Sequence, residues 1–220
     1  MALTVFRICE RVVGLVRGRR LELTTGQRAQ LEALDYDGLV SGNAQDEAVT
    51  CVRHFEFVRD SLLQAYPWVF ARRSASLAEL TLTVSGWRHM FALPPDCARL
   101  LGVVHKGREL PLWEVVGQTV GTHLAPVETR YTAKVAAVAS WPSLFVDAFT
   151  SRLAVEVVTA VQGSGSGAQG YEQQAQTAIS EAYRLRVIDE GGHLPVWEYA
   201  WDDYAHDGPG FDPLWRGYER

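Results

Sequence analysis

The chain has 220 residues, 47% of them hydrophobic, and carries 21 Lys and Arg against 26 Asp and Glu, a formal net charge of −5 at pH 7. This composition is that of a globular protein of one or two domains, and it excludes a fibrous or an intrinsically disordered chain. The negative balance excludes a general electrostatic attraction to nucleic acid, so such a role would need a local basic patch.

The N-terminal 42 residues are predicted to form one helix followed by a linker arm. Apolar residues at spacings of three and four indicate a helix over residues 4–17, namely Val5, Ile8, Val12 and Leu15. Residues 19–42 are polar, contain three glycines and carry only a weak helical signal. No small-residue cleavage site follows the apolar positions of residues 1–20, so we do not expect a signal peptide.

The strongest helical pattern covers residues 43–66. Apolar residues recur there at spacings of three and four until Pro67, and Asn43 is the expected N-cap. At ~1.5 Å per residue the helix would be roughly 33 Å long.

The period of the apolar residues then changes to two, which is typical of strands. Alternating residues lie in 80–84 and 87–93, and shorter runs rich in Val, Leu, Thr and Tyr follow at 100–104, 110–116 and 128–135. Turn residues separate these runs. We therefore predict a small antiparallel sheet or sandwich, a β insertion domain over residues 76–137.

Helical spacing returns after Trp141-Pro142 and again over residues 168–186, where Ala175, Ala178 and Ala182 share one face. The Gly/Ser run 163–167 is predicted to be a flexible connection. Residues 43–75 and 138–186 are assigned to a helical bundle. The predicted fold class is α+β: a long-helix bundle interrupted by a small antiparallel β domain, with extended N- and C-terminal arms.

Residues 187–220 are acidic and rich in aromatic residues, with eight acidic residues against two arginines and seven of the chain's 23 aromatics. Too few aliphatic residues remain for a separate core. We interpret the segment as a C-terminal docking arm in which Trp197, Tyr199 and Trp201 share one face of an extended strand that adds to another sheet. The predicted partner-docking residues are Trp197, Tyr199, Trp201, Tyr204, Phe211 and Trp215.

Cys97, with His89 and His105 nearby in sequence, has the composition of a Cys–His nucleophile. No nucleophile motif surrounds any serine or cysteine, and cysteines of half-buried strands are usually inert, so we interpret Cys97 as a packing residue. Three cysteines also provide no disulfide framework, which favours a reducing cytosol.

An acidic cluster around His206 offers ligands for a divalent cation, from Asp202, Asp203 and Asp207. The glycine and the closing glutamate of a Ca²⁺ loop are missing, and no Gly-rich phosphate loop occurs, so we expect a solvated acidic surface. The sequence thus predicts no catalytic residue, no metal site and no cofactor. It also predicts no membrane span, since no apolar stretch reaches roughly 18 to 20 residues.

Two basic clusters remain, Arg72-Arg73 and the group Arg17, Arg19 and Arg20. Either could contact DNA phosphates or an acidic partner, and ordinary surface charge is the alternative interpretation.

The order of motifs resembles that of the head-to-tail adaptor family of tailed bacteriophages, in particular the tail tubular protein A type. The resemblance covers about residues 44–186 and rests on motifs that are specific in combination. These are RDSLLQAYPWVFARR (59–73), LPPDCARLLGV (93–103), LWEVVGQTV (112–120), VETRYTAKV (127–135), SWPSLFVDAFTSRLAVEVVTAVQGS (140–164) and AQTAISEAYRLR (175–186).

The resemblance implies a structural virion protein without catalytic residues. Such a subunit is made in the host cytoplasm and forms a ring, commonly of twelve copies, in the neck of the particle. The ring joins the portal protein to the tail or nozzle protein, and genomic DNA passes through it without sequence-specific binding. We place subunit or portal contacts at Trp68, Phe70, Arg72 and Arg73.

Two alternatives to the adaptor function remain open from the sequence. A tail-terminator or another neck ring protein of a long-tailed phage would share the ring assembly but contact other neighbours. A small cytosolic enzyme or regulator would instead use Cys97 or the His206 cluster.

Overall fold

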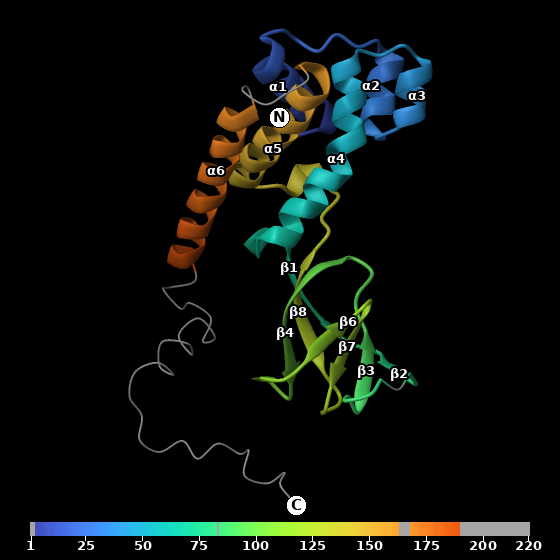
Figure 1. Cartoon of the computed structure of the whole chain (residues 1–220), viewed down its shortest axis with the longest axis vertical. Helices are drawn as coiled ribbons and strands as arrows, with labels where there is room; N and C mark the ends of the chain where they lie inside the picture. Colours follow the sequence, from blue (N-terminus) through green and yellow to red (C-terminus); the bar gives the residue numbers. More distant parts are fainter. Residues whose placement is uncertain (1–2, 83, 163–167, 190–220) are drawn as a thin grey trace, which may run out of the picture. The chain divides into compact units, whose positions relative to one another are not determined.

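The computed structural model describes residues 3–82, 84–162 and 168–189, and Figure 1 shows their secondary structure. The chain divides into two compact units, residues 1–179 and 180–220. The second unit is described only over residues 180–189, where it continues helix α6 (Ala168–Asp189). All tertiary packing reported below lies within the first unit.

Helix α1 (Val5–Arg17) confirms the first predicted helix. The Thr4 hydroxyl accepts a hydrogen bond from the amide of Arg7 at 3.3 Å, which satisfies one of the free amides at the helix start. The helix ends at Gly18, whose left-handed φ of 64° suits a residue without a side chain. Its buried face packs against α5 (Ser143–Gln162).

Two short helices, α2 (Thr25–Glu32) and α3 (Tyr36–Ser41), occupy the predicted linker. Thr24 and Asp35 cap them through their side chains. Such polar capping residues also dominate loops, and this is why the segment resembled a linker in sequence.

The N-terminal helices are held to one another by polar and apolar contacts. The Glu32 carboxylate accepts hydrogen bonds from the amides of Val5 and Phe6, at 3.1 and 3.0 Å, so the end of α2 caps the start of α1. Leu31 and Leu39 are fully buried. The prediction of an extended N-terminal arm over residues 1–42 is therefore wrong.

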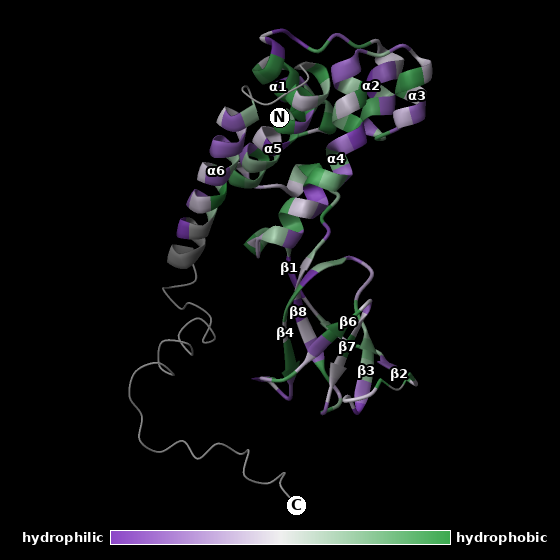
Figure 2. Cartoon of the chain, viewed as in Figure 1, coloured by the Kyte–Doolittle hydropathy of each residue, from purple (hydrophilic) through white to green (hydrophobic). Residues whose placement is uncertain are grey.

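Helix α4 (Asp46–Ala65) packs against α5, and Figure 2 shows hydrophobic and hydrophilic residues alternating around its turns. It begins at Asp46, two residues later than an N-cap at Asn43 predicts. Asn43 instead adopts a left-handed φ of 48° in the preceding turn and is not the N-cap.

An aromatic cluster forms the centre of the helical core. Phe145 lies in it, with ring centroids 4.9 Å from those of Trp68, Phe70 and Trp141. Trp68 donates its indole N–H to the carbonyl of Leu62 at 2.9 Å. The short helices η1 (Val69–Ala71) and η2 (Val138–Ser140) lie beside these aromatic residues in the sequence.

The β domain consists of two four-stranded antiparallel sheets. One has the order β1 (Arg72–Ser76), β8 (Glu128–Ala133), β4 (Cys97–His105) and β5 (Arg108–Glu109). The other has the order β2 (Glu79–Leu80), β3 (His89–Ala92), β7 (Thr119–Thr122) and β6 (Glu114–Val116). Their common core contains the buried residues Phe91, Val103, Val120 and Val127.

The strands differ in detail from the prediction. The alternation in residues 80–84 yields strand only at Glu79–Leu80, and Leu82 is exposed. Strands β1 and β7 were missed, because the polar run of β1 and the Thr/Gly run of β7 carry no alternation of apolar residues. Lys106 and Gly107, both at positive φ, form the turn between β4 and β5, and Arg108 already belongs to β5.

The predicted fold class of a long-helix bundle is wrong, and so is its extended N-terminal arm. The predicted C-terminal arm lies almost entirely outside the described residues and stays a prediction. The described residues form six helices, of which three have 13 residues or fewer, together with two small antiparallel sheets. This mixture remains broadly consistent with the α+β class. None of the described helices is long and apolar enough to cross a membrane.

Candidate interaction site

A groove opens between helix α4 and the β domain, and we call it the α4–β6 groove. Its volume is about 580 Å³. Leu93, Leu100 and Trp113 line it with apolar surface, and all three also pack against the core of the two sheets. Asp60 of α4 and the basic residues Arg99 and Lys134 supply its charged groups. The groove therefore combines apolar and polar lining with two cations and one carboxylate.

Val115 extends the apolar lining along strand β6. It lies opposite the buried Val120 of β7, and paired residues of an antiparallel ladder share one face of the sheet. Because β6 is the last strand of its sheet, Val115 stands at the margin of the core and is 43% exposed. The groove thus opens onto an incompletely covered edge of the sheet core.

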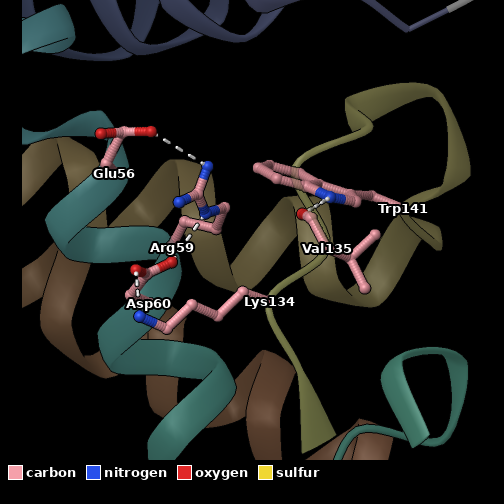
Figure 3. Close-up of polar contacts among 6 residues, drawn as sticks. All are labelled: Glu56, Arg59, Asp60, Lys134, Val135 and Trp141. Carbon is pink, nitrogen blue, oxygen red and sulfur yellow. Dashed lines mark hydrogen bonds and ion pairs between the residues drawn. The ribbon is translucent and has the colours of Figure 1, made fainter. Parts of the chain in front are cut away.

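An ion network joins α4 to the end of β8 at this groove (Figure 3). Asp60 accepts a hydrogen bond from Arg59 Nε at 2.8 Å, and its second carboxylate oxygen lies 3.5 Å from Lys134 Nζ. Arg59 is only 7% exposed and has a second partner, Glu56, at 3.5 Å. Because a buried guanidinium without partners would be costly, this network fixes the α4 wall of the groove.

Arg99 fastens the start of β4 to the end of α4. Its guanidinium donates to the carbonyl of Ala65 at 2.8 Å, where the last carbonyls of the helix have no partner within the helix. The negative end of the helix dipole also favours a cation there. Arg99 is exposed, so this contact keeps a positive charge at the groove rim.

Asp96 connects three strands beside the groove. Its carboxylate accepts a hydrogen bond from the Tyr131 hydroxyl at 3.1 Å and forms an ion pair with Arg73 at 3.1 Å. Its carbonyl accepts from the amide of Lys134 at 2.7 Å. Burial, followed by the hydrogen bond to Asp96, raises the pKa of Tyr131, so the hydroxyl keeps its proton and remains a donor at neutral pH.

The four predicted contact residues after α4 fall into two environments. Trp68 is buried in the aromatic cluster and Phe70 is half-buried beside it, so both contribute to the core. Arg72 and Arg73 are exposed on β1. A contact with another subunit or with a portal stays a prediction.

The predicted docking residues of the C-terminal segment all lie outside the described residues. They are Trp197, Tyr199, Trp201, Tyr204, Phe211 and Trp215. Their role stays a prediction. Of the predicted small-residue face of α6, Ala175 is buried within the subunit.

The structure does not bring Cys97 together with the two histidines near it in sequence. Cys97 and His105 are the first and last residues of β4, eight residues and thus about 26 Å apart. His89 lies in the other sheet, with Nδ1 2.6 Å from Glu79. Burial and the charge of Asp96 raise the pKa of the Cys97 thiol, which disfavours the nucleophilic thiolate.

Among the described residues, no group of three or more His, Cys, Asp or Glu is placed to hold a metal ion. His206, Asp202, Asp203 and Asp207 lie outside this part of the chain. All three cysteines are free thiols, and Cys9 and Cys51 are buried. The hydrogen bond between these two thiols, together with burial, raises the pKa of Cys9.

The sequence matches no protein-family model and no curated protein. The resemblance to the adaptor family therefore rests on the sequence motifs of this chain alone and stays a prediction.

Two residues of the N-terminal basic cluster, Arg17 and Arg19, form ion pairs with the buried carboxylate of Glu47. Glu47 is 3% exposed, and its Oε1 lies 3.1 Å from Arg17 Nε and 2.9 Å from an Arg19 nitrogen. Burial by itself would raise the pKa of Glu47. Its hydrogen bonds with its own backbone amide, Arg19 and Arg17 outweigh burial, so the pKa is lowered.

Replacement Glu47→Gln is expected to lower the free energy of unfolding at pH 7 by about 1–3 kcal/mol, because it removes charge-assisted hydrogen bonds. Because the pKa of Glu47 is lower in the folded state, its ionised carboxylate stabilises the fold fully above the unfolded-state pKa of about 4.3. The difference in the free energy of unfolding between variant and wild type should therefore shrink as the pH falls through the folded-state pKa. Urea denaturation across acidic pH checks this, with Glu22→Gln on the exposed surface as control; a difference independent of pH would contradict the ionic explanation.

No local sequence pattern indicates the groove. Its lining comes from α4, β4, the loop before β6 and the end of β8, which are far apart in sequence. The one available indication was that Arg99 and Lys134 are basic residues within otherwise apolar strand patterns.

Proposed function

We propose that this chain is a structural subunit of a bacteriophage virion, a head-to-tail adaptor that assembles as a ring between the portal and the tail or nozzle protein. Twelve copies would be the common arrangement in the family it resembles. The ring would enclose a channel for genomic DNA, and the subunit would act through its surfaces without catalysing a reaction.

The convergence of the resembling motifs carries this proposal. Arg73 of the first motif, Asp96 of the second and Tyr131 of the fourth meet in one hydrogen-bonded group, although they are up to 58 positions apart. Trp68 of the first motif and Phe145 of the fifth pack in one aromatic cluster. Residues that carry the resemblance thus hold the fold together, as expected if the motifs specify a common architecture.

The distribution of charge also supports a channel that does not retain DNA. The whole chain has a net charge of −5, and Arg17 and Arg19 of one basic cluster are paired with Glu47. Many unpaired basic contacts would release counterions on binding phosphates and hold the duplex in place. A subunit without such an excess lets the duplex slide.

A tail terminator or another neck ring protein is the second candidate. It would share the ring but contact different neighbours, and gene order separates the two. A gene directly after the portal and capsid genes favours the adaptor, whereas a gene beside the tape-measure or tail-tube gene favours the terminator.

The enzyme alternative is tested by Cys97→Ser and His206→Ala. We expect both variants to complement infectivity at the level of the wild-type gene, because the raised pKa of the Cys97 thiol and its place in β4 are those of a packing residue. Infectivity is measured by plaque formation with the gene supplied in trans. Loss of infectivity with normal ring assembly would support the enzyme instead.

A further inference from the structure

The α4–β6 groove has the properties of a peptide-binding site. Val115, which lines the groove, is exposed at the margin of the sheet core. Covering apolar surface contributes roughly 25 cal/mol per Å². An apolar or aromatic side chain laid along β6 would therefore be stabilised there.

The charges around the groove select an acidic occupant. The lining of the groove carries two cations, Arg99 and Lys134, against one carboxylate, Asp60, a net charge of +1, whereas the whole chain has −5. Both cations are exposed. Opposite charges at such a rim attract over several ångströms and are screened by salt.

The chain itself contains a segment of matching chemistry. Residues 190–220 carry seven acidic residues against two arginines, a net charge of −5. Within this segment, aromatic and acidic residues interleave in the run WEYAWDD (197–203). In an extended backbone Trp197, Tyr199, Trp201 and the acidic Asp203 would share one face, and Glu198 and Asp202 would point to the other.

We infer that residues 194–206 of one copy bind in the α4–β6 groove of a neighbouring copy. The aromatic residues would cover the apolar lining, and Asp203 on the same face would approach Arg99 and Lys134. The groove and the segment are unlike surfaces of one chain, and a head-to-tail pair of unlike surfaces is what a closed ring requires. This inference rests on the proposed function for the presence of neighbouring copies.

The test uses the full chain with its own segment disabled by Trp197→Ser, Tyr199→Ser and Trp201→Ser. A fluorescently labelled peptide of residues 194–206 is titrated with this variant, and its anisotropy is followed. We expect saturable binding that weakens several-fold when salt rises from about 0.1 to about 1 M.

Adding Val115→Glu to the same chain should weaken binding at least tenfold, because it places a like charge on the groove lining. The matched control is Val40→Glu on α3, since Val40 is similarly exposed at 48% and is far from the groove in sequence. It should leave the affinity unchanged. Thermal unfolding of both variants checks that they are folded.

Three outcomes would overturn the inference. The first is no binding of the peptide to the segment-disabled chain, and the second is an equal affinity in the Val115→Glu variant. The third is a wild-type chain that is monomeric at every concentration and does not bind the peptide. That result would mean that the segment occupies the groove of its own copy.

Failure of this inference and failure of the proposed function are distinguishable. The peptide titration involves neither portal nor particle, so it reports on the groove alone. A ring that forms on the portal without peptide binding to the groove would leave the adaptor proposal standing and remove only the assigned contact.

Discussion

Replacing Phe145 with alanine is expected to lower the free energy of unfolding by about 3–5 kcal/mol. Phe145 has no exposed surface and lies 4.9 Å, between ring centroids, from each of Trp68, Phe70 and Trp141. Its removal leaves a cavity and deprives three aromatic rings of their edge-to-face partner. Since the typical stability of a domain is about 5–15 kcal/mol, the loss would be a large fraction of the total.

Phe57→Ala is the matched control. Phe57 belongs to helix α4 but is 67% exposed, so its removal opens no cavity and should change the free energy of unfolding by less than about 0.5 kcal/mol. Urea denaturation of the two variants measures both values. Similar losses in the two variants would show that the aromatic cluster is not the centre of the helical core.

Deleting residues 190–220 is expected to leave a folded, soluble subunit that no longer completes particles. Residues 1–179 form a compact unit with its own helical and sheet cores, and the deleted segment has few aliphatic residues. The thermal unfolding midpoint should therefore stay near that of the full chain. Plaque formation with the gene supplied in trans should be abolished.

One control separates the effect of this deletion from that of surface changes in general. A chain carrying Val40→Glu tests whether exposed substitutions in general affect complementation, and it should complement normally. Collapse or aggregation of the shortened chain would mean that the deleted segment belongs to the core, which contradicts its assignment as a docking segment.

The spacing of apolar residues along the sequence was enough to predict the long helices. Helices α1, α4 and α5 have apolar residues at spacings of three and four, and the structure buries those faces against one another. Helices α2 and α3 escaped prediction because each has only one or two turns and buries a single leucine. In short helices the caps decide the structure, and their residues are those of loops.

The candidate site was less predictable than the helices. Arg73, Asp96 and Tyr131 were within recognisable motifs, yet nothing local to them indicates that they meet. The burial of Trp68 could not be predicted either, because an aromatic residue after a helix can lie in the core or on a contact surface. Tertiary packing decides such cases, and the α4–β6 groove is a product of that packing.

Mixing the purified chain with its portal protein and imaging the product by electron microscopy tests the central proposal most directly. We expect a rotationally symmetric ring of this chain on the face of the portal that receives the tail, with a continuous axial channel wide enough for duplex DNA. A chain that remains unbound to the portal at saturating concentration, or that binds without forming a ring around its axis, would contradict the adaptor function.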